Sequence, residues 1–386
     1  MKIAGIICEY NPLHLGHGKQ LKLVREQLGE GCGIVCLMSG NFVQRGAPAV
    51  FDKSLRARAA VLSGADLVLE LPVEYALSSA EGFAAGGVRI LDGFCDYLSF
   101  GAESGNGEDL MGTAEMLLSP AFSAALREKL DLGLSFPAAR QGALEALGGA
   151  GELLTRPNDI LAVEYCKAIL SQNSEMKILP IRRRGDYHDQ TPDPENPSAT
   201  ALRRGILAGE DWMRFVPEEA RDCFRDAAVH TLEAGERAVL ARLRTMTDAE
   251  FEDLPYGSEG LWRKFMHAAR ERATVEEILT AVKSKRYTRT RLDRMLLCAF
   301  LGLTREGMET PAPYVRVLAL NDRGRTILKK ARESRTFLNA GEIPEDPYWE
   351  LERRVGDLYG LFAVSGPEAP GIEAKRRIFN CAGEPK

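Results

Sequence analysis

Two histidines near the start of the chain have the spacing and the surroundings of a phosphate site. They belong to the stretch His14-Leu15-Gly16-His17, which follows the pair Asn11-Pro12. Two imidazoles can donate hydrogen bonds to phosphate oxygens as negative charge builds up on them. Gly16 allows close approach of the backbone because it has no side chain. Pro12 fixes a turn in which Asn11 can bond its own backbone. The pattern therefore indicates phosphate chemistry.

The same histidine pair permits two other interpretations. A His-x-x-His pair can bind zinc, but no third ligand stands at a convincing spacing, so we expect no metal site. The two rings can also be partly buried residues that only pack at the start of a helix. The choice between the phosphate, zinc and packing interpretations depends on the secondary structure predicted on either side of the pair.

The elements on either side of the histidines favour the phosphate interpretation. Ile3–Cys8 is predicted to be a strand, and Gly18–Leu28 a helix with apolar Leu21, Val24 and Leu28. In a parallel α/β sheet, ligands bind outside the carboxyl ends of the strands. A helix N-terminus at that edge offers N–H groups and a favourable dipole to phosphate.

Strand-like and helix-like segments alternate through about the first 180 residues, which predicts a parallel sheet with helices on both faces. The further strands are expected at Gly33–Met38, Leu67–Leu71, Tyr97–Phe100 and Met176–Ile181. The further helices are expected at Leu55–Leu62, at Ala80–Leu91, between Leu110 and Leu147, and at Asn158–Leu170.

From about residue 200 onwards the pattern is mostly helical. The expected helices are Pro217–Leu232, Ala234–Arg244, Gly260–Ala269, Val275–Leu279, Thr290–Phe300 and Gly324–Ala331. We therefore predict an α/β nucleotide-binding domain at residues 1–205, followed by a mostly α-helical region at 206–386.

The composition bounds the function. A chain of 386 residues with 45% hydrophobic and 27% charged residues is expected to fold as a globular protein. The apolar runs are too short for a membrane span, and no signal peptide is recognisable, so we expect a cytoplasmic protein without membrane contact. Eight cysteines lack a CxxC pair and are expected to be reduced and mostly buried. With a net charge of −5, binding of nucleic acid requires a local basic face.

A second polar motif stands at the end of the predicted domain. The stretch Pro197–Gly205, PSATALRRG, contains Ser198, Thr200 and Arg203. Two hydroxyls and a guanidinium at a loop-to-helix junction suit polyphosphate. Taken alone, the segment is better explained by a serine or threonine that caps a helix. Together with the histidine pair, it favours a phosphate site.

The two motifs resemble a known superfamily. HLGH after an N-terminal strand resembles the HIGH signature of nucleotidyltransferases and class I aminoacyl-tRNA synthetases, and PSATALR is similar to their ISSTxxR or KMSKS signature. The resemblance implies a Rossmann-like, HUP-type domain that holds ATP and directs attack on its α-phosphate.

Further stretches resemble one family in particular, the tRNA(Met) cytidine acetate ligases. They are Met38–Pro72, Ser99–Ser104, Arg156–Tyr165, Ile178–Asp189 and Ser284–Leu303. The resemblance implies that acetate and ATP form acetyladenylate and pyrophosphate. The acetyl group then passes to the wobble cytidine of elongator tRNA(Met), which becomes N4-acetylcytidine.

The resemblance also implies which residues contact ATP. They are Gly101, Asn158, an arginine assigned to Arg183, and the segment Ile7, Cys8, Glu9, Tyr10, Asn11, Pro12, Leu13, His14, Leu15, Gly16, His17, Gly18, Lys19 and Gln20. The spacing from this arginine to Tyr187 is one residue shorter than the family pattern, so Arg182 or Arg184 can hold the role instead.

The chemistry of activation assigns roles within this set. His14 and His17 are expected to bond the α-phosphate region as the catalytic pair. Lys19, Arg203 and Ser198 or Thr200 are expected to hold the leaving pyrophosphate, with Mg²⁺ as a helper ion. No covalent nucleophile is required. Cys8 lies in an apolar strand, and we expect it to pack in the core.

A basic stretch far along the chain is the predicted RNA-binding segment. Lys283–Arg294 contains six basic residues and one acid, which gives a local charge of +5. The residues expected to contact RNA are Lys283, Lys285, Arg286, Tyr287, Arg289, Arg291 and Arg294. The mixture suits phosphate contacts with one stacking ring. A solvated helix face would give the same pattern.

Two other functions are compatible with parts of this pattern. The chain could be a nucleotidyltransferase that adenylates a small phosphorylated metabolite, but the second half argues against such a compact enzyme. It could also be an RNA-binding protein with a regulatory nucleotide site, against which the intact motifs count. The polar residues Asp52, Lys53 and Arg56 suit a solvated or capping role as well as a substrate role. The sequence makes no prediction of oligomeric state.

Overall fold

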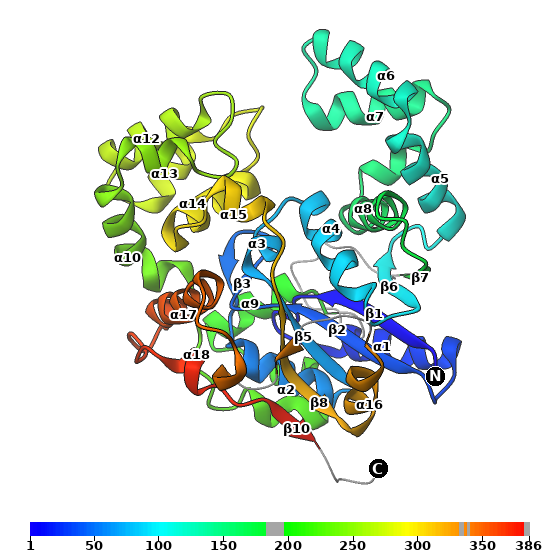
Figure 1. Cartoon of the computed structure of the whole chain (residues 1–386). Helices are drawn as coiled ribbons and strands as arrows, with labels where there is room; N and C mark the ends of the chain where they lie inside the picture. The colour runs from blue at the N-terminus through cyan, green and yellow to red at the C-terminus, as the bar shows by residue number, and fades with distance from the viewer. Residues whose placement is uncertain (183–196, 332–335, 338–339, 382–386) are drawn as a thin grey trace.

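A mostly parallel sheet forms the centre of the molecule (Figure 1). The computed structural model describes residues 1–182, 197–331, 336–337 and 340–381. Five parallel strands follow the spatial order β5–β2–β1–β6–β7. Their bounds are Ile3–Cys8 (β1), Gly33–Ser39 (β2), Leu67–Leu71 (β5), Tyr97–Ala102 (β6) and Lys177–Arg182 (β7). The predicted α/β fold with a parallel sheet is confirmed.

Helices cover both faces of this sheet because its strands are apolar on both sides. Val35 and Leu37 of β2 face the core shared with α4, α5 and α8, whereas Ile34 and Cys36 face the core shared with α1 and α2. The bounds are Leu15–Leu28 (α1), Lys53–Leu62 (α2), Ala80–Leu91 (α4), Gly107–Leu118 (α5), Pro157–Ser171 (α8) and Ala199–Ala208 (α9). A small hairpin of β3 (Phe42–Val43) and β4 (Ala47–Pro48), and the short α3 (Val73–Ala76), lie between the main elements.

Two helical lobes extend from the sheet domain and stand apart at the top of the view in Figure 1. The smaller lobe is built from α5, α6 (Pro120–Asp131) and α7 (Phe136–Ala146). The larger one contains α10 (Leu232–Thr245), α11 (Asp248–Glu252), α12 (Leu261–Glu271), α13 (Val275–Val282), α14 (Arg289–Leu301) and α15 (Arg305–Glu309). Its own core includes Phe251, Phe265 and Leu296, and α17 (Pro347–Tyr359) packs against that core.

The last third of the chain returns to the sheet, which the sequence did not predict. The strand β8 (Val315–Asn321) pairs antiparallel with β5, and β9 (Thr336–Phe337) and β10 (Phe379–Cys381) pair parallel with β8. The helices α16 (Asp322–Lys330) and α18 (Ile372–Lys375) accompany these strands. Val317 and Leu318 face opposite cores, so β8 is buried on both sides. The region after residue 206 is therefore mostly helical but also completes the sheet.

The predicted helix Pro217–Leu232 is wrong. Only a short 3-10 turn, Glu218–Cys223, forms in this segment. Tertiary contacts override the helical pattern. Phe224 packs on Phe51, with ring centroids 5.0 Å apart, and the His230 N–H donates to the Val50 carbonyl. These contacts hold the segment in irregular and extended forms over α2.

No helix among the described residues has the length and apolar character needed to cross a membrane.

Candidate active site

The two central strands of the sheet diverge where the predicted site lies. The ladder between β1 and β2 runs from Ile3 to Cys8, whereas the ladder between β1 and β6 covers only Ala4–Tyr97 and Gly5–Leu98. The chain order reverses at this point, because β2 and β5 lie on one side of β1 and β6 and β7 on the other. Ligands of open α/β sheets bind at such a switch point, beyond the carboxyl ends of the strands. The residues after β1 and β6 therefore form the candidate site.

The histidine pair forms the first turn of α1. His14 is the N-cap residue, so the helix begins three residues earlier than predicted. The two imidazole rings are stacked, with centroids 3.7 Å apart and an interplanar angle of 25°. A Cβ at Gly16 would lie 3.1 Å from Cε1 of His14, which is tighter than an ordinary contact. Glycine at this position therefore lets the His14 ring lie against the backbone of the turn.

The hydrogen bonds of the pair fix the tautomers of both rings. The Gly16 N–H donates to Nδ1 of His14 at 3.2 Å, and the His14 N–H donates to Nδ1 of His17 at 3.3 Å. A ring nitrogen that accepts a hydrogen bond carries no proton, so Nε2 is the nitrogen of each ring that can donate. This arrangement suits oxygen atoms that gain negative charge.

The turn before the histidines is held by polar contacts within the protein. The Asn11–Pro12 peptide bond is cis, and Tyr10 has a positive φ of 46°. The Val50 N–H donates to Oδ1 of Asn11 at 2.7 Å. The Tyr10 ring lies 4.9 Å from the His17 ring. The buried Asn11 side chain is therefore a structural link to the loop before α2.

Arg203 joins the two sequence motifs. Its Nη1 donates to the Asn11 carbonyl at 2.7 Å, and its Nη2 donates to Oγ1 of Thr200 at 3.2 Å. Ser198 is the N-cap of α9 and accepts from the Ala201 N–H at 3.1 Å. The capping and the phosphate interpretations of PSATALR are compatible, because the cap orients the helix whose arginine reaches the histidine loop.

A carboxylate clamp on the other side of the crevice was missed by the sequence analysis. Glu103, just beyond β6, accepts from Nδ2 of Asn158 at 2.6 Å and from the Asp159 N–H at 2.8 Å. The buried Asp159 in turn accepts from the Ser104 N–H at 3.1 Å. The N-cap residue of α8, Arg156, provides no side-chain cap, so Glu103 takes that role. The clamp sets the orientation of Asn158.

The remaining predicted ATP contacts differ in their surroundings. Leu13 is buried in a hydrophobic core, and Lys19 is exposed on α1. The Glu9 carboxylate accepts from the Gln44 N–H at 2.9 Å. Burial raises the pKa of the Cys8 thiol well above its usual range, as does the neighbouring Cys36. The thiol therefore stays protonated and is a poor nucleophile, in line with the expected packing role.

The arginine triplet is only partly described. Arg182 ends β7 and is exposed, and a Cβ at Gly105 would lie 2.9 Å from Cβ of Arg182. Arg183, the predicted ATP contact, and Arg184 lie outside the described residues.

Arg56 is a buried support of the site, not a solvated residue. Its guanidinium donates to the carbonyls of Glu9 at 2.6 Å, Ser39 at 3.1 Å and Phe51 at 2.9 Å, and also to that of Gly40. The side chain has no exposed surface. It ties together the backbone at the ends of β1 and β2. No periodicity signals this role, because the acceptors are backbone atoms that come together only in the fold.

Lys53 lies at the centre of a buried ionic network beside the same edge of the sheet. Its Nζ is 2.6 Å from Oε1 of Glu70 and 2.8 Å from Oε1 of Glu373. Arg316 and Arg376 also pair with Glu373. Burial alone would raise the pKa of Glu373, but the charges of Lys53, Arg376 and Arg316 lower it to about 2. The network attaches α2 and β5 to the end of the chain.

Asp52 has the capping role that was one of its predicted alternatives. The Ser54 N–H donates to Oδ1 of Asp52 at 2.8 Å at the start of α2. Arg376 approaches both carboxylate oxygens of Asp52, at 2.6 and 2.9 Å. Asp52 thus belongs to the same ionic network.

The predicted RNA-binding stretch does not form one exposed surface. Tyr287 and Arg294 are each only 8% exposed. Arg294 donates to the Gln44 carbonyl at 3.2 Å and lies over the Tyr256 ring. The reason is helical geometry, because α14 begins at Arg289 and turns Arg294 toward the sheet domain. A stacking role for Tyr287 and a phosphate contact from Arg294 conflict with this burial.

Three more arginines of the stretch are engaged by the protein itself. Arg286 pairs with Glu259 at 2.7 Å. Arg289 pairs with Glu276 and Asp293, each at 2.7 Å. Arg291 donates to the Tyr256 carbonyl at 2.7 Å. By contrast, Lys283 and Lys285 are exposed and make no ion pair among the described residues.

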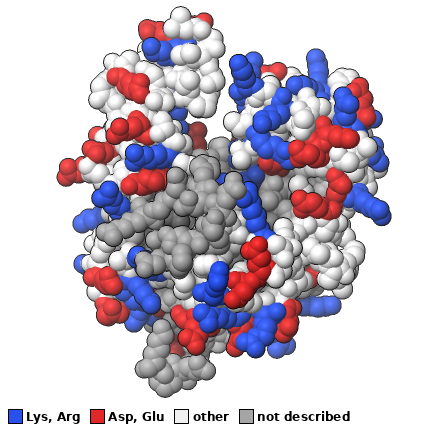
Figure 2. Space-filling model, turned by 180° about the vertical axis from the view of Figure 1, so that it is seen from behind, with Lys and Arg blue, Asp and Glu red and all other residues white. Residues whose placement is uncertain are grey.

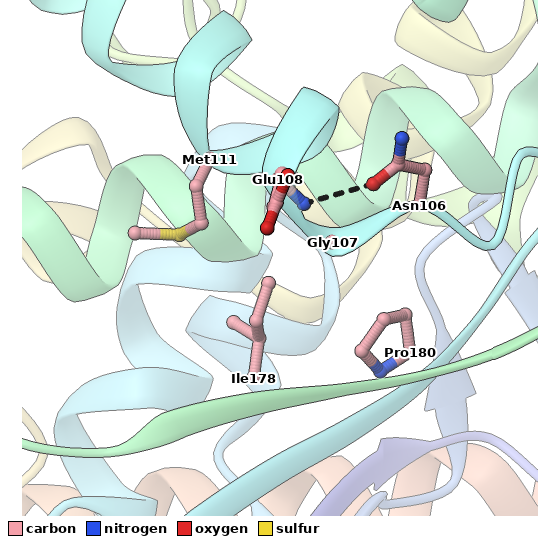
Figure 3. A pocket seen from close by; sticks show the side chains of 6 residues that line it. All are labelled: Asn106, Gly107, Glu108, Met111, Ile178 and Pro180. Atoms are coloured by element: carbon pink, nitrogen blue, oxygen red, sulfur yellow. Dashed lines mark hydrogen bonds between the residues drawn. The ribbon is translucent and has the colours of Figure 1, made fainter.

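A separate shallow pocket of about 460 Å³ lies beside β7 and the start of α5 (Figure 3). Its lining residues are Asn106, Gly107, Glu108, Met111, Ile178 and Pro180. The Glu108 N–H donates to Oδ1 of Asn106 at 3.1 Å, as the dashed line shows. None of the predicted site residues lines this pocket, so it is not part of the candidate active site.

The described residues contain no group of three or more histidine, cysteine, aspartate or glutamate side chains that could hold a metal ion.

Comparison with known proteins gives a consistent assignment. A model of the HIGH Nucleotidyl Transferase family matches residues 1–368. A tRNA(Met) cytidine acetate ligase from Clostridium novyi is 37% identical, over 95% of this chain and 96% of the relative. A second tRNA(Met) cytidine acetate ligase, from Anoxybacillus flavithermus, is 34% identical over 93% of this chain and 94% of the relative.

Solved structures give the same result. Thermotoga maritima TmcAL bound with alpha-thio ATP superposes with a TM-score of 0.88 at 30% identity, over 99% of this chain and all of that one. The apo form of the same protein gives a TM-score of 0.90.

Proposed function

The chain belongs to the tRNA(Met) cytidine acetate ligase family of HIGH nucleotidyl transferases, and from this premise we propose how it acts. It is an ATP-dependent ligase that activates acetate as acetyladenylate. It transfers the acetyl group to the N4 amine of the wobble cytidine of elongator tRNA(Met). The observation that carries this proposal is the contact of Arg203 with Asn11, since it brings both signature motifs to the switch point of the sheet.

In the first step, an acetate oxygen attacks the α-phosphorus of ATP, and the bond from that phosphorus to the bridging oxygen of pyrophosphate breaks. Negative charge builds up on the α-phosphate oxygens and on the leaving group. The Nε2–H donors of His14 and His17 are proposed to stabilise the charge on the α-phosphate. Neither histidine needs to transfer a proton, because acetate attacks as an anion.

The leaving pyrophosphate is proposed to lie at the start of α9. Arg203 supplies a permanent positive charge there, while Ser198 and Thr200 supply hydroxyl groups. Lys19 on α1 is exposed and can approach the same phosphates. The stacked histidines and α9 would then hold the two ends of the bond that breaks.

In the second step, the cytidine N4 amine attacks the acetyl carbon, the bond from that carbon to the AMP oxygen breaks, and the amine loses a proton. The adenosine part is proposed to lie over Gly101 and Asn158, on the side held by Glu103. Glycine at 101 would allow close approach of the nucleoside.

Mg²⁺ is proposed as an ion that accompanies the ATP phosphates. Magnesium is commonly bound by substrate phosphates and water with one or two carboxylates, so a cluster of three protein ligands is not required. We assign no protein ligand to the ion and no step to it.

The proposed division of labour is that residues 1–205 bind ATP and acetate, while the helical lobe after residue 206 binds tRNA. The strands β8 and β10 belong structurally to the sheet, so the division concerns function and not independent folding.

One assay tests the function. The protein is incubated with labelled pyrophosphate and ATP, with and without acetate, in the absence of tRNA. Acetate-dependent exchange of label into ATP is expected. Absence of exchange with acetate, both without and with added tRNA(Met), would overturn the ligase assignment. Exchange that depends on a phosphorylated metabolite and not on acetate would identify a different adenylating enzyme.

A further inference from the structure

The helix α12 carries a row of basic side chains on its outer face. Its buried residues include Leu261, Phe265 and Ala269, which face the core of the larger lobe. Arg263, Lys264, His267 and Arg270 are exposed. Positions separated by three or four residues share one face of a helix, so these four side chains form one stripe. No motif in the sequence indicates a role for this helix.

The two cations at the start of α12 are not neutralised by the protein. Among the described residues, neither Arg263 nor Lys264 makes an ion pair, whereas Arg270 pairs with Asp248 at 2.5 Å. The Arg263 guanidinium lies 5.0 Å from the centre of the Trp262 ring, which supports the side chain without removing its charge. The stripe is therefore most positive at the N-terminal end of α12.

A hydrogen bond fixes that end of α12 beside the end of α13. Nζ of Lys264 donates to the Val282 carbonyl at 3.1 Å. The next residues, Lys283 and Lys285, are exposed and have no ion-pair partner among the described residues. The start of α12 and the loop after α13 therefore lie side by side, although they are about 20 residues apart in sequence.

The charge balance from α12 to the start of α14 supports binding of a polyanion. Residues 261–294 contain ten Lys and Arg against four Asp and Glu, whereas the whole chain has a net charge of −5. Figure 2 shows the lobe on the right, where blue side chains lie over its surface, some of them beside red ones. A local positive surface on an acidic protein directs a polyanion to one place.

We propose that the start of α12 and the loop after α13 form a surface that binds the phosphate backbone of RNA. It consists of Arg263, Lys264, His267, Lys283 and Lys285. This inference rests on the proposed function for the identity of the RNA, a tRNA. It moves the contact surface away from Arg286 and from α14, because Arg286, Arg289, Arg291 and Arg294 are engaged by other parts of the protein. The contacts are to phosphate, since four of the five side chains of the surface are Lys or Arg.

The test compares two pairs of charge reversals in the full chain. One variant combines Arg263→Glu with Lys283→Glu, and Lys264 is left in place because it attaches α12 to α13. The control combines Lys329→Glu with Lys330→Glu on α16, which changes the net charge equally at exposed positions at the opposite end of the molecule (Figure 1). Binding of an unmodified elongator tRNA(Met) transcript is measured by fluorescence anisotropy at several salt concentrations.

The α12 variant is expected to bind at least tenfold more weakly than the wild type. The slope of log K against log salt is expected to fall by about 1 for each phosphate that the variant no longer neutralises. Acetate-dependent exchange without tRNA should be unchanged in both variants. Equal affinity and slope for wild type and α12 variant would overturn the inference, as would an equally large decrease in affinity for the control. If the wild type itself does not bind the transcript, the proposed tRNA function fails instead.

Discussion

Nη1 of Arg203 donates a 2.7 Å hydrogen bond to the backbone carbonyl of Asn11, a residue 192 positions earlier in the chain. The bond connects the start of α9 to the loop that presents the histidine pair. Arg203 thus has two roles in our proposal, since it positions the loop and contributes charge beside the leaving phosphates.

Arg203→Lys keeps the positive charge but cannot make both hydrogen bonds of the guanidinium. Loss of a charged hydrogen bond corresponds to about 1.5–3 kcal/mol, so acetate-dependent exchange is expected to fall by roughly tenfold to a hundredfold. Arg204→Lys, on the exposed side of the same helix, is the matched control and should remain near wild type. An unchanged exchange rate in Arg203→Lys would show that the link to Asn11 is dispensable.

His14 combines a helix cap with a proposed catalytic donor, and two substitutions separate these roles. Asparagine is a good N-cap residue but has no group at the position of Nε2. His14→Asn is therefore expected to unfold within a few degrees of the wild type while losing exchange activity by at least about a hundredfold. His14→Ala should lose the activity and, in addition, about 1 kcal/mol of stability.

Thermal melting and pyrophosphate exchange are measured on both His14 variants. Substantial exchange activity in His14→Asn would refute the donor role. His17→Ala keeps His14 as the N-cap residue but removes the acceptor of the His14 N–H. It should lose exchange activity and retain tRNA binding, because the proposed RNA surface lies on another lobe.

Glu103 is proposed to position Asn158 without touching ATP. Glu103→Gln removes the charge from the clamp and weakens its bonds to the Asn158 amide and the Asp159 N–H. The KM for ATP is expected to rise about tenfold, with a smaller change in kcat, because a positioning contact acts mainly on binding. Glu108→Gln at the start of α5 is a control with the same chemical change on an exposed residue. Equal effects of the two substitutions would argue against a specific clamp.

Lys53 holds a buried position between two carboxylates. Lys53→Met fits the space but leaves Glu70 without its cation and removes one of three cations from Glu373. Breaking a buried ion pair from one side typically costs about 3–5 kcal/mol. Urea unfolding of Lys53→Met should show a loss of this size. Adding Glu70→Gln should recover part of it, because the uncompensated charge is removed, and a strictly additive double variant would contradict the proposed coupling.

The buried carboxyl of Glu74 is expected to make the stability of the protein depend on pH. Burial raises the pKa of this carboxyl to about 7, aided by the charge of Glu70, and its Oε2 has no hydrogen-bond partner among the described residues. Since the folded pKa exceeds the usual value, the contribution to stability is complete below about pH 4.5 and is lost as the pH rises to about 7. A shift of this size corresponds to roughly 3 kcal/mol.

Glu74→Gln removes this ionisation. The free energy of unfolding of the variant minus that of the wild type is expected to be larger at pH 8 than at pH 5. The free energy of unfolding in urea is measured for both proteins at the two pH values. Burial and the charge of Glu70 also raise the pKa of Glu352, to about 8, but Glu352 is present in both proteins. An identical difference at the two pH values would contradict the proposed ionisation of Glu74.

Local patterns in the sequence predicted the parallel sheet and the two phosphate motifs. Repeated strand and helix periods identify β1, β2, β5, β6 and β7, and HLGH and PSATALR are each contiguous. The supports of the site were not predictable in this way. Arg56 and Lys53 occupy the first turn of α2, where charged residues are usually solvated. Their burial depends on backbone carbonyls from other strands and on Glu373, more than 300 residues away.

The basic stretch shows a second limit. Its composition indicated an RNA surface, but composition does not tell which side of a helix meets the core. Arg294 turns inward, while Arg263 and Lys264, which were not considered, turn outward. The packing of each helix against the core determines whether a cationic side chain is exposed to a partner or makes a hydrogen bond within the protein.

The antiparallel pairing of β8 with β5 has a consequence for synthesis on the ribosome. Leu67 pairs with Leu320, so β5 is an open sheet edge until some 250 further residues have been translated. At about 5–20 residues per second, this takes on the order of tens of seconds. An unpaired apolar strand invites aggregation, and Lys53 lacks Glu373 over the same interval. The nucleotide-binding sheet therefore begins to form early in translation and is completed late. The nascent chain is most prone to aggregation before β8 has been translated.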